Sequence, residues 1–110
     1  MKEIRFFNLP NGKCPFIGWV ENLKNRKVAA IVKTRLERVM LGNNGDHRAV
    51  GDELYELKIH ESPGYRVYFV ELSKNIVLIL LGGNKSSQKR DIQKAKKYWL
   101  EFKSEKEGKL

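Results

Sequence analysis

The sequence predicts an α+β domain in which an N-terminal strand, a helical hairpin, a three-stranded meander and a C-terminal helix form a small antiparallel sheet covered by helices. Two observations lead to this prediction. Apolar residues recur every three or four positions before residue 42 and after residue 86, which is typical of helices, whereas they alternate with polar residues from residue 54 onward, which is typical of strands. Residues 76–81 (IVLILL) are an unbroken apolar run, which predicts a central strand with helices on both faces.

The N-terminal half begins with a predicted strand at residues 3–8, which ends at the turn residues 9–12. Residues 16–23 and 26–41 are predicted as two helices that form a hairpin. The second helix has the clearest apolar stripe, made by Val28, Val32, Leu36, Val39 and Met40. Residues 42–52 contain three Gly, two Asn and two Asp, which predicts a loop.

The C-terminal half is predicted to contain strands at residues 54–60, 65–70 and 76–81. Residues 62–64 (SPG) supply the first turn, and Glu56, Lys58 and His60 are expected on the outward face of the first strand. A last helix capped by Ser86 or Ser87 buries the stripe Ile92, Ala95, Trp99 and Phe102. We therefore expect one domain over residues 1–102 and a polar tail at residues 103–110 that frays.

Length, charge and hydropathy limit the classes of function that the sequence allows. The 110 residues correspond to one domain, which excludes a multidomain enzyme. The 22 Lys and Arg residues exceed the 13 Asp and Glu residues, so the net charge is +9, and such a field attracts polyanions or acidic proteins. No apolar run approaches the roughly 20 residues of a membrane helix, so we expect a cytoplasmic protein without membrane contact.

Several classes of site are missing from the sequence. The single Cys14 forms neither an internal disulfide nor a cysteine-based zinc site, and we expect it in a loop or the core. There is no Walker-type phosphate loop, no dinucleotide fingerprint and no pair of His residues at metal-ligand spacing. We therefore expect no cofactor and no metal.

Basic residues on the predicted sheet could hold a phosphodiester. Lys58 could contact phosphate or transfer a proton, the alternative being an ordinary exposed lysine paired with Glu56. Arg66 lies among aromatic residues, and its planar guanidinium suits phosphate. Lys58 and Arg66 share a face only if the loop between their strands has an odd number of residues, whereas a two-residue turn would separate them.

Further candidates lie at the ends of elements. Lys85 precedes the last helix, where an anion could meet its ammonium group and free backbone N–H groups, with Ser86, Ser87 and Gln88 as donors; the alternative is a capped helix with a lysine nearby. His60 could transfer protons near neutral pH or could simply end a strand at the surface. The basic residues that could extend an RNA-binding surface are Lys33, Arg38, Arg48, Lys89 and Arg90.

Four short motifs occur in this order of elements: residues 45–46 (GD), 54–59 (LYELKI), 63–68 (PGYRVY) and 82–88 (GGNKSSQ), the last followed by Asp91, Ile92 and Ala95. With them, residues 1–100 resemble the RelE/ParE superfamily of bacterial toxins, and within it the phage-derived, HigB-like addiction-module killer proteins. The resemblance implies a RelE-like fold and the toxin of a type II toxin–antitoxin pair. It also implies an antitoxin with a helix-turn-helix domain, through which alone the pair would bind operator DNA.

The same resemblance implies a reaction. RelE-like members cut messenger RNA in the ribosomal A site without a metal, because the ribose 2′-OH attacks the adjacent phosphate and leaves a 2′,3′-cyclic phosphate and a 5′-OH. By motif position, Lys58 corresponds to a base or phosphate ligand, Arg66 to the arginine that stabilises the transition state, and Lys85 to the basic residue of the last loop. Cations at these positions would stabilise the added charge of the phosphorane.

The chain departs from RelE at two positions. Glu56 stands where a second lysine is expected, and Tyr98 lies too far along the last helix to match the aromatic acid of RelE. The resemblance therefore leaves the general acid and base unassigned. Glu56 and His60 are candidate bases, and Gln88 is a candidate for orienting the substrate.

Two alternatives to the nuclease stay open. ParE-like toxins share the fold but poison DNA gyrase without cutting nucleic acid, and a basic binding module could have kept the fold and lost activity. Lys58, Arg66 and Lys85 clustered in one concave site would favour the nuclease. Scattered basic residues and an apolar groove near the C-terminus would favour a protein-binding poison.

Overall fold

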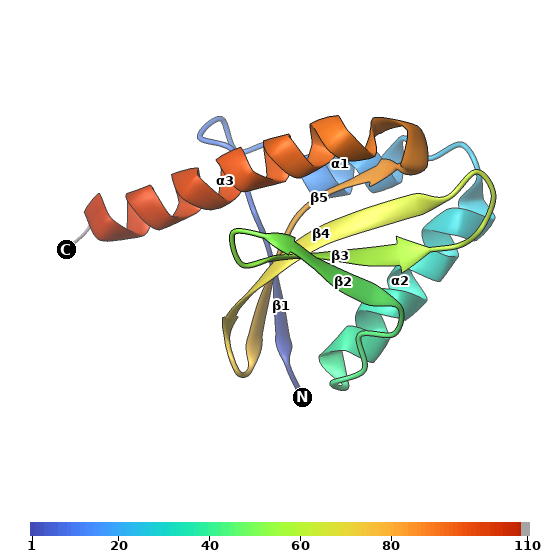
Figure 1. Cartoon of the computed structure of the whole chain (residues 1–110), viewed down its shortest axis with the longest axis horizontal. Helices are drawn as coiled ribbons and strands as arrows, with labels where there is room; N and C mark the ends of the chain where they lie inside the picture. The colour runs from blue at the N-terminus through green and yellow to red at the C-terminus, as the bar shows by residue number, and fades with distance from the viewer. Residues whose placement is uncertain (109–110) are drawn as a thin grey trace.

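A computed structural model describes the backbone of residues 1–108 and the side chains of residues 1–106. It has one five-stranded sheet in the order β1-β5-β4-β3-β2, with α1 and α2 on one face and α3 across the other (Figure 1). The elements are β1 (Glu3–Phe6), α1 (Pro15–Glu21), α2 (Arg26–Met40), β2 (His47–Gly51), β3 (Leu54–Ile59), β4 (Tyr65–Ser73), β5 (Ile76–Asn84), a 3-10 turn η1 (Lys85–Ser87) and α3 (Gln88–Gly108). The predicted α+β class is confirmed.

The sheet is mostly an antiparallel meander. Strands β2, β3, β4 and β5 pair with their neighbours in antiparallel register, whereas β1 pairs with β5 in parallel. The parallel pair is possible because the chain passes through α1, α2 and the meander between these two strands. The predicted antiparallel sheet is confirmed for the meander, and the parallel pairing of β1 with β5 is a feature that the sequence analysis did not specify.

The apolar run of β5 separates two cores, as its sequence predicts. Residues 77–83 are all buried. On one face, Ala95, Tyr98 and Trp99 of α3 form a core with β4 and β5 residues, and on the other, Val28, Val32 and Val39 of α2 pack against the sheet with Phe16 of α1. Burial of apolar surface on both faces is the main force that fixes the helices to the sheet.

Strand β2 was missed because residues 42–52 read as a loop. Arg48 and Ala49 pair with Glu56 and Tyr55 across an antiparallel ladder, and a register shift follows before Gly51. As an edge strand, β2 is mostly exposed and so lacks the apolar alternation of a strand. The turn into β3 also lacks the usual Asn-Gly signal, since Asp52 and Glu53 both adopt positive φ angles, of 53° and 71°.

Helix α3 differs from its prediction at both ends. Asn84, not Ser86 or Ser87, is the cap of the turn η1 that precedes the helix. The helix continues past Phe102 to Gly108, so the frayed tail expected from residue 103 is wrong over residues 103–108; residues 109–110 lie outside the described residues. Cation–π contacts of Lys103 with Trp99 and of Lys106 with Phe102 support these last turns.

No helix in the described part of the chain is long and apolar enough to cross a membrane.

Candidate functional site

The site is built on the α3 side of the sheet, on one end of strands β3 and β4. Lys58 lies directly opposite Arg66, and Ile59 opposite Tyr65. The connecting loop is therefore residues 60–64, which is five residues and an odd number. The condition for Lys58 and Arg66 to share a face is met, and the two-residue turn is excluded.

Glu56 is the centre of a buried hydrogen-bond network. Its side chain is fully buried, although the sequence pattern had placed it on an outward face. Oε1 accepts from Nε of Arg48 at 2.8 Å. Oε2 accepts from the Tyr68 hydroxyl at 3.0 Å and from Nε2 of Gln88 at 2.8 Å. The strand is buried on both faces here because the start of α3 covers this side of it.

The electrostatics of the network keep Glu56 ionised. Burial of the carboxyl raises its pKa, but three hydrogen bonds from neighbouring side chains outweigh burial and hold the pKa of Glu56 below its ordinary value. Burial, followed by the charge of Glu56, raises the pKa of Tyr68 far above its usual range, so its hydroxyl remains a donor. A buried carboxylate with a lowered pKa is a poor proton acceptor, and the candidate role of Glu56 as a base is not supported.

Arg66 is held against this carboxylate. Its Nε lies 3.7 Å from Oε1 of Glu56, and its Nη1 donates to the backbone oxygen of Tyr65 at 3.0 Å. The Arg66 side chain is only 10% exposed. Its buried Nε has no hydrogen-bond partner among the described residues. A guanidinium in this state has an unfilled donor and a fixed position.

Lys85 approaches Arg66 from the end of β5. Its backbone N–H donates to the Gly64 oxygen at 3.0 Å. A Cβ placed on Gly64, whose φ is +100°, would lie 3.6 Å from Nη1 of Arg66 and 3.5 Å from Cβ of Lys85. Both side chains therefore pass over the same glycine. The structure brings together Lys58, Arg66 and Lys85, the three basic residues predicted for catalysis.

The turn before α3 does not provide the free N–H groups expected there. The backbone N–H of Lys85 is bound to Gly64, and that of Ser87 donates to Oδ1 of Asn84 at 3.1 Å. Asp91, buried in the first helical turn, accepts from the Ser87 hydroxyl. A carboxylate thus already occupies this helix end, which leaves the ammonium group of Lys85 as the contribution of the turn to anion binding.

His60 lies at the rim of the same end of the sheet. It forms a hydrogen-bonded pair with the carboxylate of Asp46, and hydrogen bonding to His60 lowers the pKa of Asp46. The backbone N–H of Lys58 donates to the backbone oxygen of Asp46 at 2.9 Å, so the His60–Asp46 pair adjoins Lys58. The His60 side chain is 70% exposed. An exposed imidazole oriented by a carboxylate is suited to proton transfer.

The other predicted residues fall into two groups. Arg48, Lys89 and Arg90 border the site: Arg48 is bound to Glu56, and Lys89 and Arg90 are exposed in the first turns of α3. Lys33 and Arg38 lie on α2, against the opposite face of the sheet, so the structure does not bring them together with the site and their RNA-binding role stays a prediction. The stripe of α2 correctly placed them away from the core but could not tell which side of the sheet the helix covers.

Sequence reasoning also missed residues that build the site. Tyr68 is opposite Glu56 on β4. Asn84 and Asp91 organise the turn that carries Lys85 through hydrogen bonds with Ser87, the one residue of the three that the sequence analysis had indicated as a donor. The alternation of β4 could have shown that Tyr68 and Arg66 share a face. Gln88, expected to orient substrate, instead donates to Glu56.

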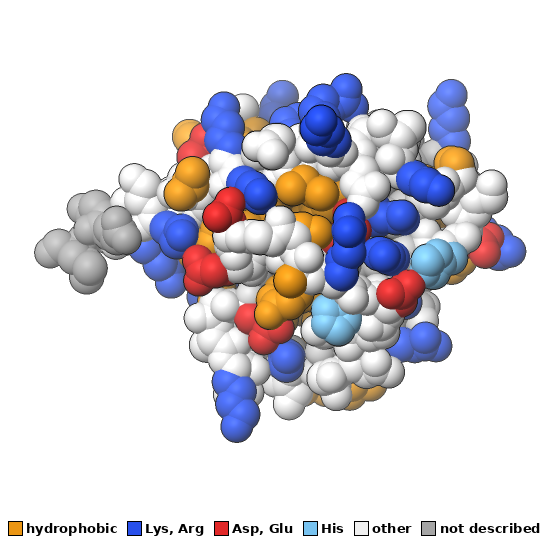
Figure 2. Space-filling model, viewed as in Figure 1, with side chains coloured by type: hydrophobic (Ala, Val, Ile, Leu, Met, Phe, Trp, Pro, Cys, Tyr) orange, Lys and Arg blue, Asp and Glu red, His pale blue; other side chains and the backbone are white. Residues whose placement is uncertain are grey.

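Figure 2 shows the surface over this region, where Lys and Arg side chains gather with histidine side chains over β2, β3 and β4. Three hollows lie on the described part of the molecule, and none of them is lined by Lys58, Arg66 or Lys85. Within residues 1–106, no group of three or more His, Cys, Asp and Glu side chains is placed to hold a metal ion. Cys14 immediately precedes α1 and is partly buried.

Comparison with known proteins gives one informative match. The chain is 42% identical over 81 residues to an uncharacterized protein of Haemophilus influenzae strain Rd, and the alignment covers 74% of this chain and 82% of the relative. No protein-family model matches the chain. The similarity therefore extends over most of both proteins.

Proposed function

The chain belongs to the same family as the Haemophilus influenzae protein, and we propose that it is a metal-independent endoribonuclease toxin that cuts messenger RNA on the ribosome. The observation that supports this proposal is the meeting of Lys58, Arg66 and Lys85 at one end of the sheet. Three cations held by strands and a capped turn are suited to a phosphodiester. The net charge of +9 favours approach to RNA.

The arrangement suits the transition state of ribose 2′-OH attack. The phosphorane carries more negative charge than the substrate, so cations that are already fixed stabilise it more than they stabilise the ground state. Arg66 is the best fixed of the three because the Glu56 carboxylate and the Tyr65 carbonyl both hold its guanidinium. Lys58 and Lys85 would bind the nonbridging oxygens beside it.

Proton transfer needs a different group. His60 is exposed, adjoins Lys58 and is oriented by Asp46, so we assign it as the base that removes the 2′-OH proton. The 5′-oxygen then leaves with a proton from an acid, for which the Lys58 and Lys85 ammonium groups are the candidates. Glu56 is assigned a positioning role through Arg66, Arg48 and Gln88.

A second candidate function is supported by a different observation. A hollow of about 1050 Å³ lies between the segment after β1 and the C-terminal half of α3. It is lined in part by Phe7, Pro10, Leu100 and Phe102, and Leu100 is 63% exposed. An apolar hollow near the C-terminus suits a toxin that binds a protein such as DNA gyrase. In either case we expect a cognate antitoxin as the neutralising partner.

The two functions are separated by inducing the protein in bacteria, mapping new 5′-OH RNA ends against ribosome position, and following a reporter of DNA breaks. The nuclease predicts growth arrest with cuts inside translated codons, and both are lost in Lys85→Ala. Arrest with DNA breaks and no new RNA ends would overturn the nuclease and support the gyrase poison. Lys74→Ala is the matched control, because Lys74 is exposed in the turn at the other end of β4 and β5.

A further inference from the structure

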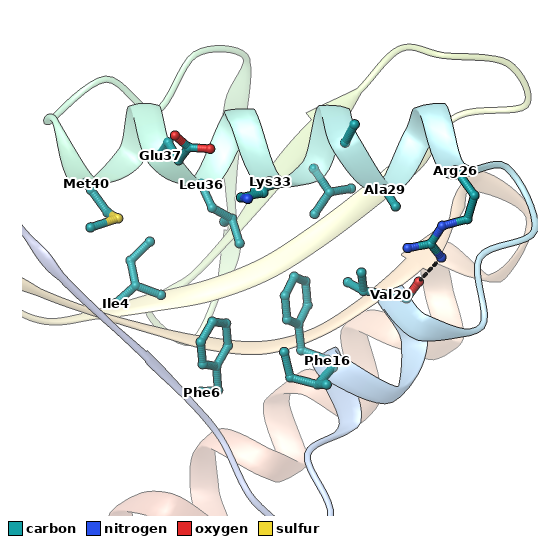
Figure 3. Close-up of a pocket in the computed structure, with 13 residues that line it drawn as sticks. Ile4, Phe6, Phe16, Val20, Arg26, Ala29, Lys33, Leu36, Glu37 and Met40 are labelled. Carbon is teal, nitrogen blue, oxygen red and sulfur yellow. Dashed lines mark hydrogen bonds between the residues drawn. The ribbon is translucent and has the colours of Figure 1, made fainter.

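An apolar groove lies on the other side of the molecule, where α2 faces α1 and β1 (Figure 3). Its volume is about 630 Å³. Ile4, Phe16, Val20, Leu36 and Met40 point into it from three elements. The groove has no part in the cluster around Glu56, which lies on the α3 side of the sheet. The proposed nuclease site therefore does not account for this groove.

Exposed apolar side chains concentrate at this groove. Phe6 and Ile17, which line it, are 37% and 39% exposed. Met1 and Leu41 are 89% and 72% exposed, and a 2.7 Å hydrogen bond from the Lys2 N–H to the Met40 oxygen places the two residues beside the end of the groove. Four of the five large exposed apolar residues of the described chain thus lie on one side. Such grouping marks an interaction surface.

The shape of the groove fits a helix. The residues that α2 contributes to the lining recur at spacings of one to three from its first residue to its last, so one side of the helix borders the groove over the 15 residues of α2. That corresponds to about 22 Å, or about four helical turns. Ala29 and Ala30 lie on this face, and their short side chains would let a second helix approach closely.

The positive charge around the groove favours a partner with acidic residues. Arg26 and Lys33 are on its border with a single carboxylate, Glu37. The whole of α2 carries five basic residues against that one acidic residue. Two copies of this chain packed through α2 would bring like charges together, which disfavours a homodimer at this face.

We propose that this groove binds an amphipathic helix of another protein, about 15 residues long, whose apolar stripe enters the groove and whose flanks carry Asp or Glu. Its apolar residues would contact Phe6, Ile17 and Leu36. Its carboxylates would face Arg26 and Lys33. Helix-in-groove recognition of this kind uses anchors at positions i, i+3, i+4 and i+7. The inference does not depend on RNA cleavage.

The test uses three fluorescein-labelled helical peptides of about 15 residues that share one leucine stripe and carry Glu, Gln or Lys on its flanks. Fluorescence anisotropy with the full chain measures each Kd. We expect the Glu peptide to bind in the micromolar range and the Lys peptide to bind at least about tenfold more weakly. No saturable binding of the Glu peptide, or equal binding of all three, would overturn the proposal.

Two exposed substitutions locate the binding, with folding checked by circular dichroism. Ile17→Gln is expected to raise the Kd of the Glu peptide about fivefold. Lys33→Glu is expected to reverse the preference, so that the Lys peptide binds more tightly than the Glu peptide. Lys74→Glu, at an exposed position of the turn between β4 and β5 and outside the groove, should leave every Kd unchanged. Unchanged binding in Ile17→Gln and Lys33→Glu would overturn the proposal. So would sedimentation that shows self-association abolished by Ile17→Gln, because a second copy would then be the occupant.

Discussion

Nε of Arg66 lies 3.7 Å from Oε1 of Glu56, inside a sheet where Glu56 is fully buried and Arg66 nearly so. This pair connects the core to the surface cluster. The carboxylate is satisfied by three other donors, whereas Arg66 Nε has no hydrogen-bond partner among the described residues. Glu56 therefore fixes the position of the Arg66 guanidinium through charge without accepting a hydrogen bond from its Nε.

Removing Glu56 should destabilise the fold strongly. Glu56→Ala leaves the Arg66 charge buried without its partner, and we expect the free energy of unfolding to fall by about 3–5 kcal/mol. Denaturant unfolding followed by circular dichroism measures this change. Glu71→Ala, at an exposed position of β4, is the control and should stay within about 0.5 kcal/mol of the parent. Equal stability of the two variants would contradict the central place of Glu56.

Stability should depend on Glu56 in acid. The folded pKa of Glu56 lies below its ordinary value of 4.5, so the unfolded chain binds more protons than the folded chain in the range below that value. The stabilisation is fully present above pH 4.5 and is lost as the pH falls through the folded pKa. Glu56→Gln should reduce the slope of unfolding free energy against pH below pH 4.5. An unchanged slope would show that Glu56 is not held ionised.

The two glycines at the end of β5 should resist substitution. A Cβ on Gly82 would lie 2.2 Å from the Trp19 ring, and one on Gly83 would lie 1.9 Å from Oδ2 of Asp91. Gly82→Ala and Gly83→Ala should each destabilise by about 1–3 kcal/mol, because the neighbouring side chains must move. Gly18→Ala in α1 is the control, since its Cβ would meet no atom within 4 Å, and it should be neutral or stabilising. Thermal unfolding of the three variants would test this order.

RNA binding should be strongly dependent on salt. Each phosphate neutralised on single-stranded RNA contributes a slope of about −0.7 to the plot of log K against log salt concentration. Lys58→Ala should make this slope shallower by about 0.7, whereas Lys74→Ala should leave it unchanged. Filter binding of an RNA oligonucleotide over a range of KCl concentrations gives both slopes. A slope that Lys58→Ala does not change would remove Lys58 from the phosphate contacts.

The sequence predicted most elements of the fold because their apolar periodicity reflects burial. The run at residues 76–81 marked a buried strand, and the stripe of α2 marked a helix. It failed at β2, whose pairing with β3 satisfies the backbone although its side chains are exposed. It failed again beyond residue 102, where contacts such as Lys103 with Trp99 and Glu53 support polar helical turns.

The basic residues of the candidate site were predictable from the sequence, whereas the buried network behind them was not. Lys58, Arg66 and Lys85 were found from residue type and position, and the parity of the loop between β3 and β4 was correctly stated as the condition that decides whether two of them meet. The burial of Glu56 was not predictable from β3 alone, since it depends on Gln88 of α3 and Arg48 of the missed strand. The position of Lys33 and Arg38 relative to the site was not predictable, because a helical stripe does not reveal which face of the sheet the helix covers.

The most direct test of the account is cleavage of a defined messenger RNA on purified, programmed ribosomes under single-turnover conditions. A nuclease site at Lys58, Arg66 and Lys85 predicts products with 2′,3′-cyclic phosphate and 5′-OH ends, and a cleavage rate that Lys85→Ala lowers by about 10²–10³ while Lys74→Ala leaves it unchanged. Intact RNA with the parent protein, or equal cleavage rates for Lys85→Ala and the parent, would contradict the assignment of the Lys58, Arg66 and Lys85 cluster as a nuclease site.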